Sequence, residues 1–242
     1  MIRCMPWYKR WFGEEYLELY SHRDEPEAEE HVDFVERHLG GSRPGAVLDL
    51  ACGAGRHTAA LRRRGYRTLG IDLSLTLLAR QELPRVAGDM RLLPFAAGSF
   101  DWVLNFFTSF GYFESERENF LVLEEILRVL TPGGRFLIDL MNPGPVLADL
   151  KPRDSQLLEG RKVEIERWYD AGRQRINKRI EVSAPGEPCR TFLESVRLYQ
   201  PEEVMIGLRW AGLEVASLFG NFHGDPYERD SERLILTGVK PV

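Results

Sequence analysis

Two glycines and two carboxylates between residues 47 and 72 have the spacing of a ligand-binding loop. Residues 47–57 read VLDLACGAGRH, so an apolar run leads into Gly53 and Gly55 and then into an expected helix. Glycine permits a tight turn and lets a ligand approach the backbone, and the first turn of a helix presents unpaired N–H groups. Asp72, 19 residues after Gly53 in GIDLS, is where a carboxylate can bind a ribose diol. The pattern therefore predicts a site for a nucleoside-containing ligand.

The residues around the glycines favour a cationic ligand over a dinucleotide. A dinucleotide fingerprint has a third glycine three residues after the second, and Thr58 stands there instead. Asp49 adds a carboxylate near the loop, which repels a phosphate and attracts a cation. S-adenosylmethionine carries an ammonium and a sulfonium group and no phosphate. A nicotinamide-dependent reductase, which shares the two glycines and the ribose acid, stays open as an alternative.

Alternating patterns predict the elements that position these residues. Apolar runs predict strands at 46–50, 68–71, 85–87, 100–106 and 135–140, and 3.6-residue periodicity or capping residues predict helices at 26–39, 56–64, from 74 and at 116–130. Strands that alternate with helices indicate a parallel α/β sheet. Residues 161–199 instead show period-2 runs separated by turns, which predict a small antiparallel insert. A helix from 201 and strands at 213–218 and 233–239 follow.

Composition excludes several classes of protein. With 32 Lys+Arg against 37 Asp+Glu the net charge is −5, which makes a nucleic-acid partner improbable. Three cysteines cannot form a disulfide framework, and no Cys/His spacing predicts a metal site. The N-terminal residues lack the apolar segment of a signal peptide, and no apolar run approaches the ~20 residues that span a bilayer. We expect a cytoplasmic protein that does not contact membranes.

Four sequence blocks together resemble the class I S-adenosylmethionine-dependent methyltransferases, in particular small-molecule enzymes with a β insert before the last helix. The blocks are VLDLACGAGRH, GIDLS, GDMRLLPF and the pair FDWVLNFFTSFGYF and LTPGGRFLIDL. The resemblance implies a Rossmann-like α/β fold: a seven-stranded, mostly parallel sheet with an antiparallel last strand and helices on both faces. We expect one methyltransferase domain over 1–242, with an N-terminal lid and helix (1–40), a cofactor-binding core (44–150), the insert (160–200) and a closing helix and strands (201–242).

The resemblance also implies which residues bind S-adenosylmethionine and release S-adenosylhomocysteine. The glycine loop would pass under the methionine moiety, Asp72 would bind the ribose hydroxyls, and Leu73 would pack on the adenine. The aromatic residues of 1–24 predict a lid on the sulfonium side, because an aromatic face stabilises a cation by ~0.5–2 kcal/mol. Alternatively, these residues only cover an edge of the sheet. The full expected cofactor set is Tyr16, Tyr20, Asp49, Gly53, Ala54, Gly55, Asp72, Leu73, Asp89, Met90, Asn105 and Phe106.

No motif identifies a general base, so the catalytic residues are not predicted. Methyl transfer is an in-line displacement to which a protein mainly contributes alignment, and an amine acceptor needs less help from a base than a hydroxyl. We therefore expect a small-molecule acceptor, an amine or a hydroxyl, with Tyr112 and His223 as candidates for its pocket. RNA or protein methylation and non-catalytic cofactor binding remain alternatives, and the oligomeric state is not predicted.

Overall fold

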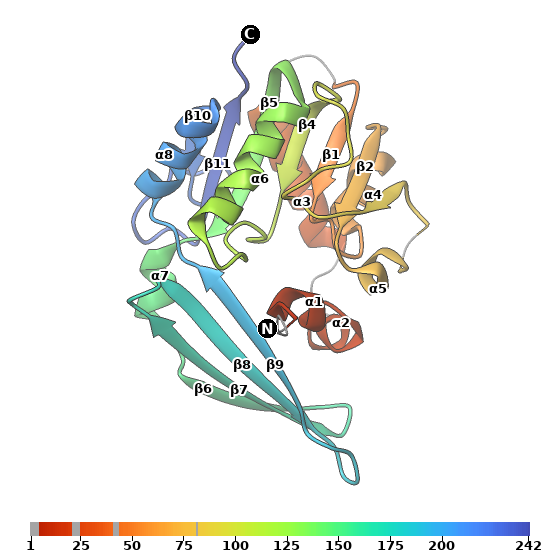
Figure 1. The fold of residues 1–242 in the computed structure, drawn as a ribbon, viewed down its shortest axis with the longest axis vertical. Coiled ribbons are helices and arrows are strands. Elements are labelled where there is room, and N and C mark those ends of the chain that lie inside the picture. Colours follow the sequence, from red (N-terminus) through yellow and green to blue (C-terminus); the bar gives the residue numbers. More distant parts are fainter. Residues whose placement is uncertain (1–4, 21–24, 41–43, 81) are drawn as a thin grey trace.

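The main sheet of the computed structural model has seven strands in the order β10-β11-β5-β4-β1-β2-β3 (Figure 1). The structure describes residues 5–20, 25–40, 44–80 and 82–242. The strands are β1 (Val47–Leu50), β2 (Thr68–Asp72), β3 (Arg85–Ala87), β4 (Phe100–Asn105), β5 (Leu130–Met141), β10 (Glu214–Phe219) and β11 (Arg233–Val239). β11 runs antiparallel to both of its neighbours, β5 and β10, whereas the pairs β5–β4, β4–β1, β1–β2 and β2–β3 are parallel. The expected Rossmann-like sheet with an antiparallel last strand is confirmed.

Helices cover both faces of this sheet. Helices α3 (Glu25–Leu39) and α4 (Arg56–Arg63) pack on one face, and α6 (Glu116–Val129) and α8 (Pro201–Ala211) pack on the other (Figure 1). The shorter helices are α1 (Trp7–Trp11), α2 (Glu14–Leu19), α5 (Leu75–Leu78) and α7 (Pro143–Ala148). Local residues set the ends of the long helices: the Ser115 hydroxyl accepts the Glu118 N–H at the start of α6, and Gly212, at φ +94°, ends α8.

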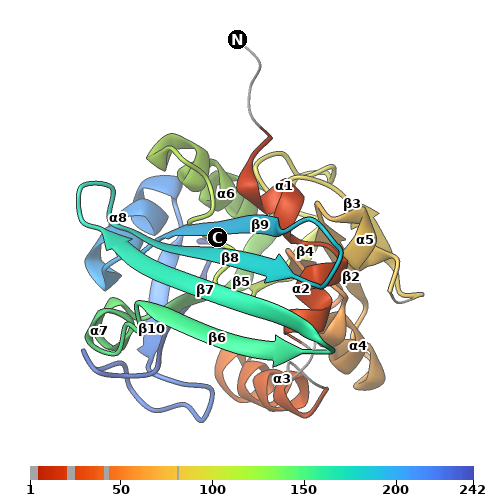
Figure 2. The same ribbon diagram turned by 90° about the horizontal axis from the view of Figure 1, so that it is seen from below.

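A second, four-stranded antiparallel sheet lies beyond the carboxyl ends of the parallel strands. Its order is β6-β7-β8-β9, with β6 (Arg153–Leu158), β7 (Arg161–Asp170), β8 (Arg175–Ser183) and β9 (Arg190–Arg197). Figure 2 shows this sheet crossing α1 and α2, which lie between it and the main sheet. Trp11 of α1 is buried against Val163 and Ile180 of the insert. This packing anchors the N-terminal helices over the edge of the main sheet.

Two strands differ from their expected ranges by more than one residue. The insert includes β6, which begins at Arg153, before the expected range of 160–200. Its side chains are almost all exposed and the first four are polar, so no apolar alternation marks it in the sequence. β5 begins at Leu130 rather than at 135, because Leu130 pairs with Phe100 before the register shifts. None of the helices in the described residues combines the length and the apolar character needed to cross a bilayer.

Candidate active site

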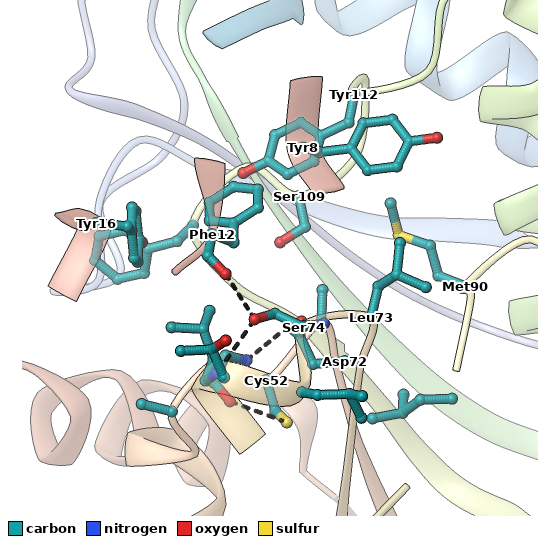
Figure 3. Close-up of a pocket in the computed structure, with 18 of the residues that line it drawn as sticks. Tyr8, Phe12, Tyr16, Cys52, Asp72, Leu73, Ser74, Met90, Ser109 and Tyr112 are labelled. Carbon is teal, nitrogen blue, oxygen red and sulfur yellow. Dashed lines mark hydrogen bonds between the residues drawn. The ribbon is translucent and has the colours of Figure 1, made fainter. Parts of the chain in front are cut away.

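A cavity of about 510 Å³ opens where β1, β2 and β4 end. Parallel strands bring their carboxyl ends to one edge of the sheet, where open α/β sheets bind ligands, and the volume lies within the usual range for small-molecule sites. Figure 3 shows Asp72 and Ser74 below this space and aromatic side chains above it. The predicted residues that line the cavity are Tyr16, Tyr20, Asp49, Gly53, Ala54, Asp72, Leu73, Asp89, Met90, Phe106 and Tyr112.

The turn after β1 has an unusual backbone conformation. Ala51, Gly53 and Gly55 have φ values of +59°, +57° and +83°, in the left-handed region that glycine adopts without steric cost. Gly55 is the N-terminal cap of α4 rather than part of the cavity lining. Its role is therefore to turn the chain into α4, while Gly53 and Ala54 border the cavity itself.

The Asp72 carboxylate joins two backbone segments at the floor of the cavity. Oδ2 accepts the Gly53 N–H and Oδ1 accepts the Ser74 N–H, each at 2.8 Å. Burial raises the pKa of Asp72, and these two N–H groups oppose that rise. The Leu73 N–H lowers the pKa of Asp72 as well. Because an ionised carboxylate has about four acceptor positions, it can also accept from a hydroxyl donor of a ligand. This arrangement is suited to a vicinal diol.

Asp49 lies beneath the loop, with only 1% of its surface exposed. Its Oδ2 accepts the Thr58 hydroxyl at 2.6 Å. Burial raises the pKa of Asp49 to about 6, and the hydrogen bonds from Thr58 limit the rise. At neutral pH the cavity therefore has a buried negative charge close beneath its floor, next to that of Asp72.

Asp49→Asn is expected to stabilise the free protein at pH 8 by about 1–3 kcal/mol, because the folded state no longer buries a charge. Folded wild type takes up a proton near pH 6, whereas the unfolded chain does so near its ordinary value of 3.8. Wild type therefore gains stability from this group as the pH falls below 6. The gap in unfolding free energy between Asp49→Asn and wild type should therefore narrow by about 1 kcal/mol from pH 8 to pH 5. Urea unfolding at several pH values measures the gap. A gap that does not change with pH would contradict the assignment of the raised pKa to Asp49.

Asp89 reaches the cavity already paired with a cation. Its Oδ1 accepts the Arg91 Nε at 3.0 Å and its Oδ2 accepts Arg91 Nη2 at 2.6 Å. Burial raises the pKa of Asp89, but the Arg91 hydrogen bonds outweigh it and leave that pKa below its ordinary value. Arg91 also binds Glu118 of α6 at 2.5 Å and lies over the Phe113 ring. Asp89 is therefore held as a carboxylate by a network that the sequence analysis did not anticipate.

The N-terminal aromatic residues divide between two roles. Tyr8, Phe12, Tyr16 and Tyr20 line the cavity, as a lid would, whereas Trp11 is part of the insert core. The Phe12 carbonyl accepts the Ser74 hydroxyl at 2.6 Å, which ties the segment to the residues after Asp72 (Figure 3). The Tyr20 hydroxyl donates to Glu194 of β9 at 3.0 Å. The segment thus bridges the glycine-loop edge of the main sheet and the insert.

Besides Gly55, two predicted site residues lie outside the cavity lining. The exposed His223 side chain faces Glu30 of α3 at 3.3 Å, because Asn221 Oδ1 accepts three N–H groups and closes a turn there. The expectation that His223 belongs to the acceptor pocket is therefore corrected. Asn105 is buried and donates to the Leu50 carbonyl at 2.8 Å, so it braces β4 against the glycine loop.

Arg56 is a cavity residue that the sequence analysis missed. It begins α4, lines the cavity, pairs with Glu27 and lies over the Phe107 ring at 4.2 Å. The available signal was its position directly after Gly55, in the helix turn that faces a ligand. The next residue, His57, stacks on Phe106 at 4.0 Å and shares a 2.9 Å hydrogen bond with His31.

The His31–His57 pair adds no positive charge beside Arg56. Burial lowers the pKa of His31 to about 3 and the pKa of His57 well below its ordinary value, and Arg56 lowers both further. Both rings are therefore neutral at pH 7, with one N–H shared between them.

Comparisons with known proteins agree with this geometry. The family model described as a methyltransferase domain matches residues 48–138. Cypemycin N-terminal methyltransferase from Streptomyces sp is 30% identical over 200 residues, which cover 78% of this chain and 81% of that protein. The dTDP-3-amino-3,4,6-trideoxy-alpha-D-glucopyranose N,N-dimethyltransferase of Streptomyces venezuelae is 30% identical over 193 residues, or 74% and 79% of the two chains.

A solved structure shares the fold. The CcbJ methyltransferase from Streptomyces caelestis superposes with a TM-score of 0.79 at 19% identity, covering 96% of this chain and 98% of that one. With the matched domain, relatives matched over about four fifths of their length and the sheet order in agreement, the chain belongs to the class I S-adenosylmethionine-dependent methyltransferases.

Proposed function

We propose that the protein transfers the methyl group of S-adenosylmethionine to the nitrogen of a small-molecule amine. The observation that carries this proposal is the cavity, in which the Asp72 carboxylate, the Gly53 turn and a set of aromatic rings surround one space of about 510 Å³. The residues present fit the cofactor. Asp72 has acceptor positions free for the ribose diol, and the buried carboxylate of Asp49 attracts cations and disfavours a phosphate.

The proposed cofactor orientation follows from the order of residues along the cavity. The methionine end lies over Gly53 and Ala54, with Arg56 available for its carboxylate. The ribose lies at Asp72, and the adenine lies between Leu73 and Met90, with Asp89 at its edge. Arg91 keeps Asp89 ionised, so that it accepts a hydrogen bond from an amino group rather than donating one. Tyr16, Tyr20 and Phe106 close the methionine side, and Asn105 acts only by bracing the strand end.

Among the described residues, the proposed acceptor side of the cavity is mainly aromatic. Phe12 stacks on Tyr112 with ring centroids 5.6 Å apart, and Phe107 and Tyr16 border the same cavity. Aromatic faces stabilise cations by ~0.5–2 kcal/mol, which suits an amine that becomes an ammonium on methylation. A hydroxyl acceptor would need a base aligned with it. Tyr112 is the proposed acceptor-pocket residue.

Methyl transfer mainly requires that the sulfonium methyl group and the acceptor nitrogen be aligned. S-adenosylmethionine supplies a sulfonium methyl group, and the sulfur leaves as a neutral thioether when a lone pair attacks in line. The chain's residues hold the two reactants in register and exclude water, which is worth up to ~7–11 kcal/mol in well-oriented systems. The neutral amine attacks, and the methylated ammonium then loses a proton to solvent. No residue of the chain therefore needs to act as a strong base.

A peptide N-terminal amine is a second candidate acceptor. The relative named as a cypemycin N-terminal methyltransferase supports it, just as the amino-sugar N,N-dimethyltransferase supports a small amine. Both candidates share a nitrogen nucleophile, so the aromatic acceptor side suits either.

A thermal-shift titration with S-adenosylhomocysteine, S-adenosylmethionine and NADH tests the cofactor. At about 100-fold above its dissociation constant, the bound ligand should add ~2.7 kcal/mol, or roughly 5–10 °C for a chain of this size. Transfer of a labelled methyl group to an amino sugar, its hydroxyl analogue and a short peptide then tests the acceptor. We expect label on an amine and none on the hydroxyl analogue. A shift with NADH alone would reject the cofactor, and labelling of the hydroxyl analogue alone would reject the amine.

A further inference from the structure

Two consecutive residues after β4 have a backbone conformation that their side chains disfavour. Phe107 and Thr108 have φ values of +58° and +55°. A Cβ atom makes this left-handed region unfavourable, and such residues persist only where the surrounding structure imposes the conformation. Phe107 lines the cavity, and Thr108, the next residue, is buried. The strain is therefore located in the cavity wall.

The restraint comes from Asp139 on β5, whose side chain is fully buried. Its Oδ2 accepts the Phe107 N–H at 2.8 Å, and its backbone carbonyl accepts the Thr108 N–H at 2.9 Å. One residue thus binds both N–H groups of the strained pair. Nothing local in the sequence of the loop supplies an equivalent partner.

Arg233, the first residue of β11, completes the restraint. Its Nε and Nη2 contact Asp139 Oδ1 at 2.8 and 2.7 Å, and Nη2 also donates to the Thr108 hydroxyl at 3.0 Å. The side chain is 20% exposed, so the ion pair is largely shielded from water. Arg233 does not line the cavity. It reaches the cavity wall through Asp139, through the Thr108 hydroxyl and through the Phe107 ring, over which its guanidinium lies at 5.8 Å.

The strained pair in turn orders the cavity wall. The Phe107 ring lies under the Arg56 guanidinium at 4.2 Å, and the preceding Phe106 ring stacks on His57 at 4.0 Å. A flip of Phe107 or Thr108 to negative φ would redirect the backbone between these rings. Phe107 and Arg56 would then lose their mutual orientation on the methionine and acceptor side.

We infer that Arg233 is a positioning residue for methyl transfer, which acts through Asp139 to hold Phe107 and Thr108 in their left-handed conformation. The wall beside the reacting groups is then formed before the substrates bind. This inference rests on the proposed function, because it assigns the wall to the methyl-transfer side of the cavity. Arg233 itself touches neither substrate.

Arg233→Met tests the inference, with Arg128→Met as the matched control. Arg128 also pairs with a carboxylate, Glu125, and also holds a loop by donating to the Leu93 and Phe95 carbonyls, but neither carbonyl residue lines the cavity. We expect Arg233→Met to lower kcat at least tenfold, since misalignment by about 1 Å can cost up to 100-fold. KM and the S-adenosylhomocysteine dissociation constant should change less than about threefold. Arg128→Met should leave kcat within about twofold of wild type.

Amide hydrogen exchange in the free protein gives a readout that needs no substrate. The Phe107 and Thr108 amides should lose protection in Arg233→Met and keep it in Arg128→Met. Adding Thr108→Gly to Arg233→Met should restore kcat at least threefold, because glycine adopts the left-handed conformation without strain. Unchanged protection at both amides, or an Arg233→Met kcat like that of wild type, would overturn the inference. Wild type that binds no S-adenosylhomocysteine would instead reject the proposed function.

Discussion

Asp72→Ala is expected to weaken binding of S-adenosylhomocysteine by at least about 100-fold. Hydrogen bonds to a charged group contribute about 1.5–3 kcal/mol each, and the variant loses both proposed bonds to the ribose diol. It also releases the Gly53 and Ser74 N–H groups, each of which binds the carboxylate at 2.8 Å. Isothermal titration calorimetry measures the affinity, and thermal unfolding verifies that the variant is folded.

Asp101→Ala is the matched control for this change. Asp101 Oδ2 accepts the Gly45 and Ala46 N–H groups at 2.6 and 3.0 Å, much as Asp72 joins two backbone segments. Asp101 begins β4 with Phe100, so it lies at the opposite end of the parallel strands from the cavity. We expect Asp101→Ala to lower stability and leave the affinity unchanged. Equal losses of affinity in both variants would mean that Asp72 only supports the fold.

Gly53→Val should reduce the same affinity by at least about 30-fold. Gly53 has a φ of +57°, and a β-branched residue there is strained. A Cβ atom would meet only Leu77 Cδ1, at 3.8 Å, so space is available and the strain is in the backbone. Relaxation toward negative φ would move the Gly53 N–H away from Asp72 and disturb the loop beneath the proposed methionine moiety. Calorimetry with S-adenosylhomocysteine measures the loss.

Gly98→Val carries the same kind of strain at a remote position. Gly98 has a φ of +66°, a Cβ there would meet nothing within 4 Å, and the residue precedes β4, away from the cavity. It should lose stability comparably, with a cost of roughly 1–2 kcal/mol for a left-handed residue, and retain affinity. If Gly98→Val weakened binding as much as Gly53→Val, backbone strain alone would account for both results and the glycine loop would have no special part in binding.

Local sequence patterns were sufficient to predict the part of the site that is built by neighbouring strands and their loops. The strand–GxG–helix–strand–acid order predicted that Gly53 and Asp72 lie together, because the carboxyl ends of neighbouring parallel strands meet at one edge. The structure adds that the Asp72 carboxylate binds the Gly53 N–H directly. The apolar runs predicted the individual strands and the period-2 runs predicted the insert, because periodicity records which face of each element is buried. The seven-stranded sheet was implied by the resemblance to the methyltransferase family.

Contacts between distant segments were decided only by the tertiary structure. The sequence placed His223 in the acceptor pocket, but the turn closed by Asn221 directs it to Glu30. β6 was missed because an exposed edge strand has no buried face to mark it. Asp89 was predicted at the cavity, yet its pairing with Arg91 depends on a loop conformation that no spacing rule specifies.

The sequence by itself therefore determined the fold class, the glycine turn and the position of Asp72 beside it, since each depends on residues within one strand–loop–helix unit or on its immediate neighbour. Strand order and register determined the contacts between residues that are far apart in the sequence. Asp139 and Arg233 are 94 residues apart and meet only because β11 lies antiparallel beside β5. The hydrogen bonds of Tyr20 and Glu18 likewise join the N-terminal segment to an insert more than 130 residues away. Such contacts leave no periodic pattern in the local sequence, because they form and stabilise the protein only when the whole sheet has assembled.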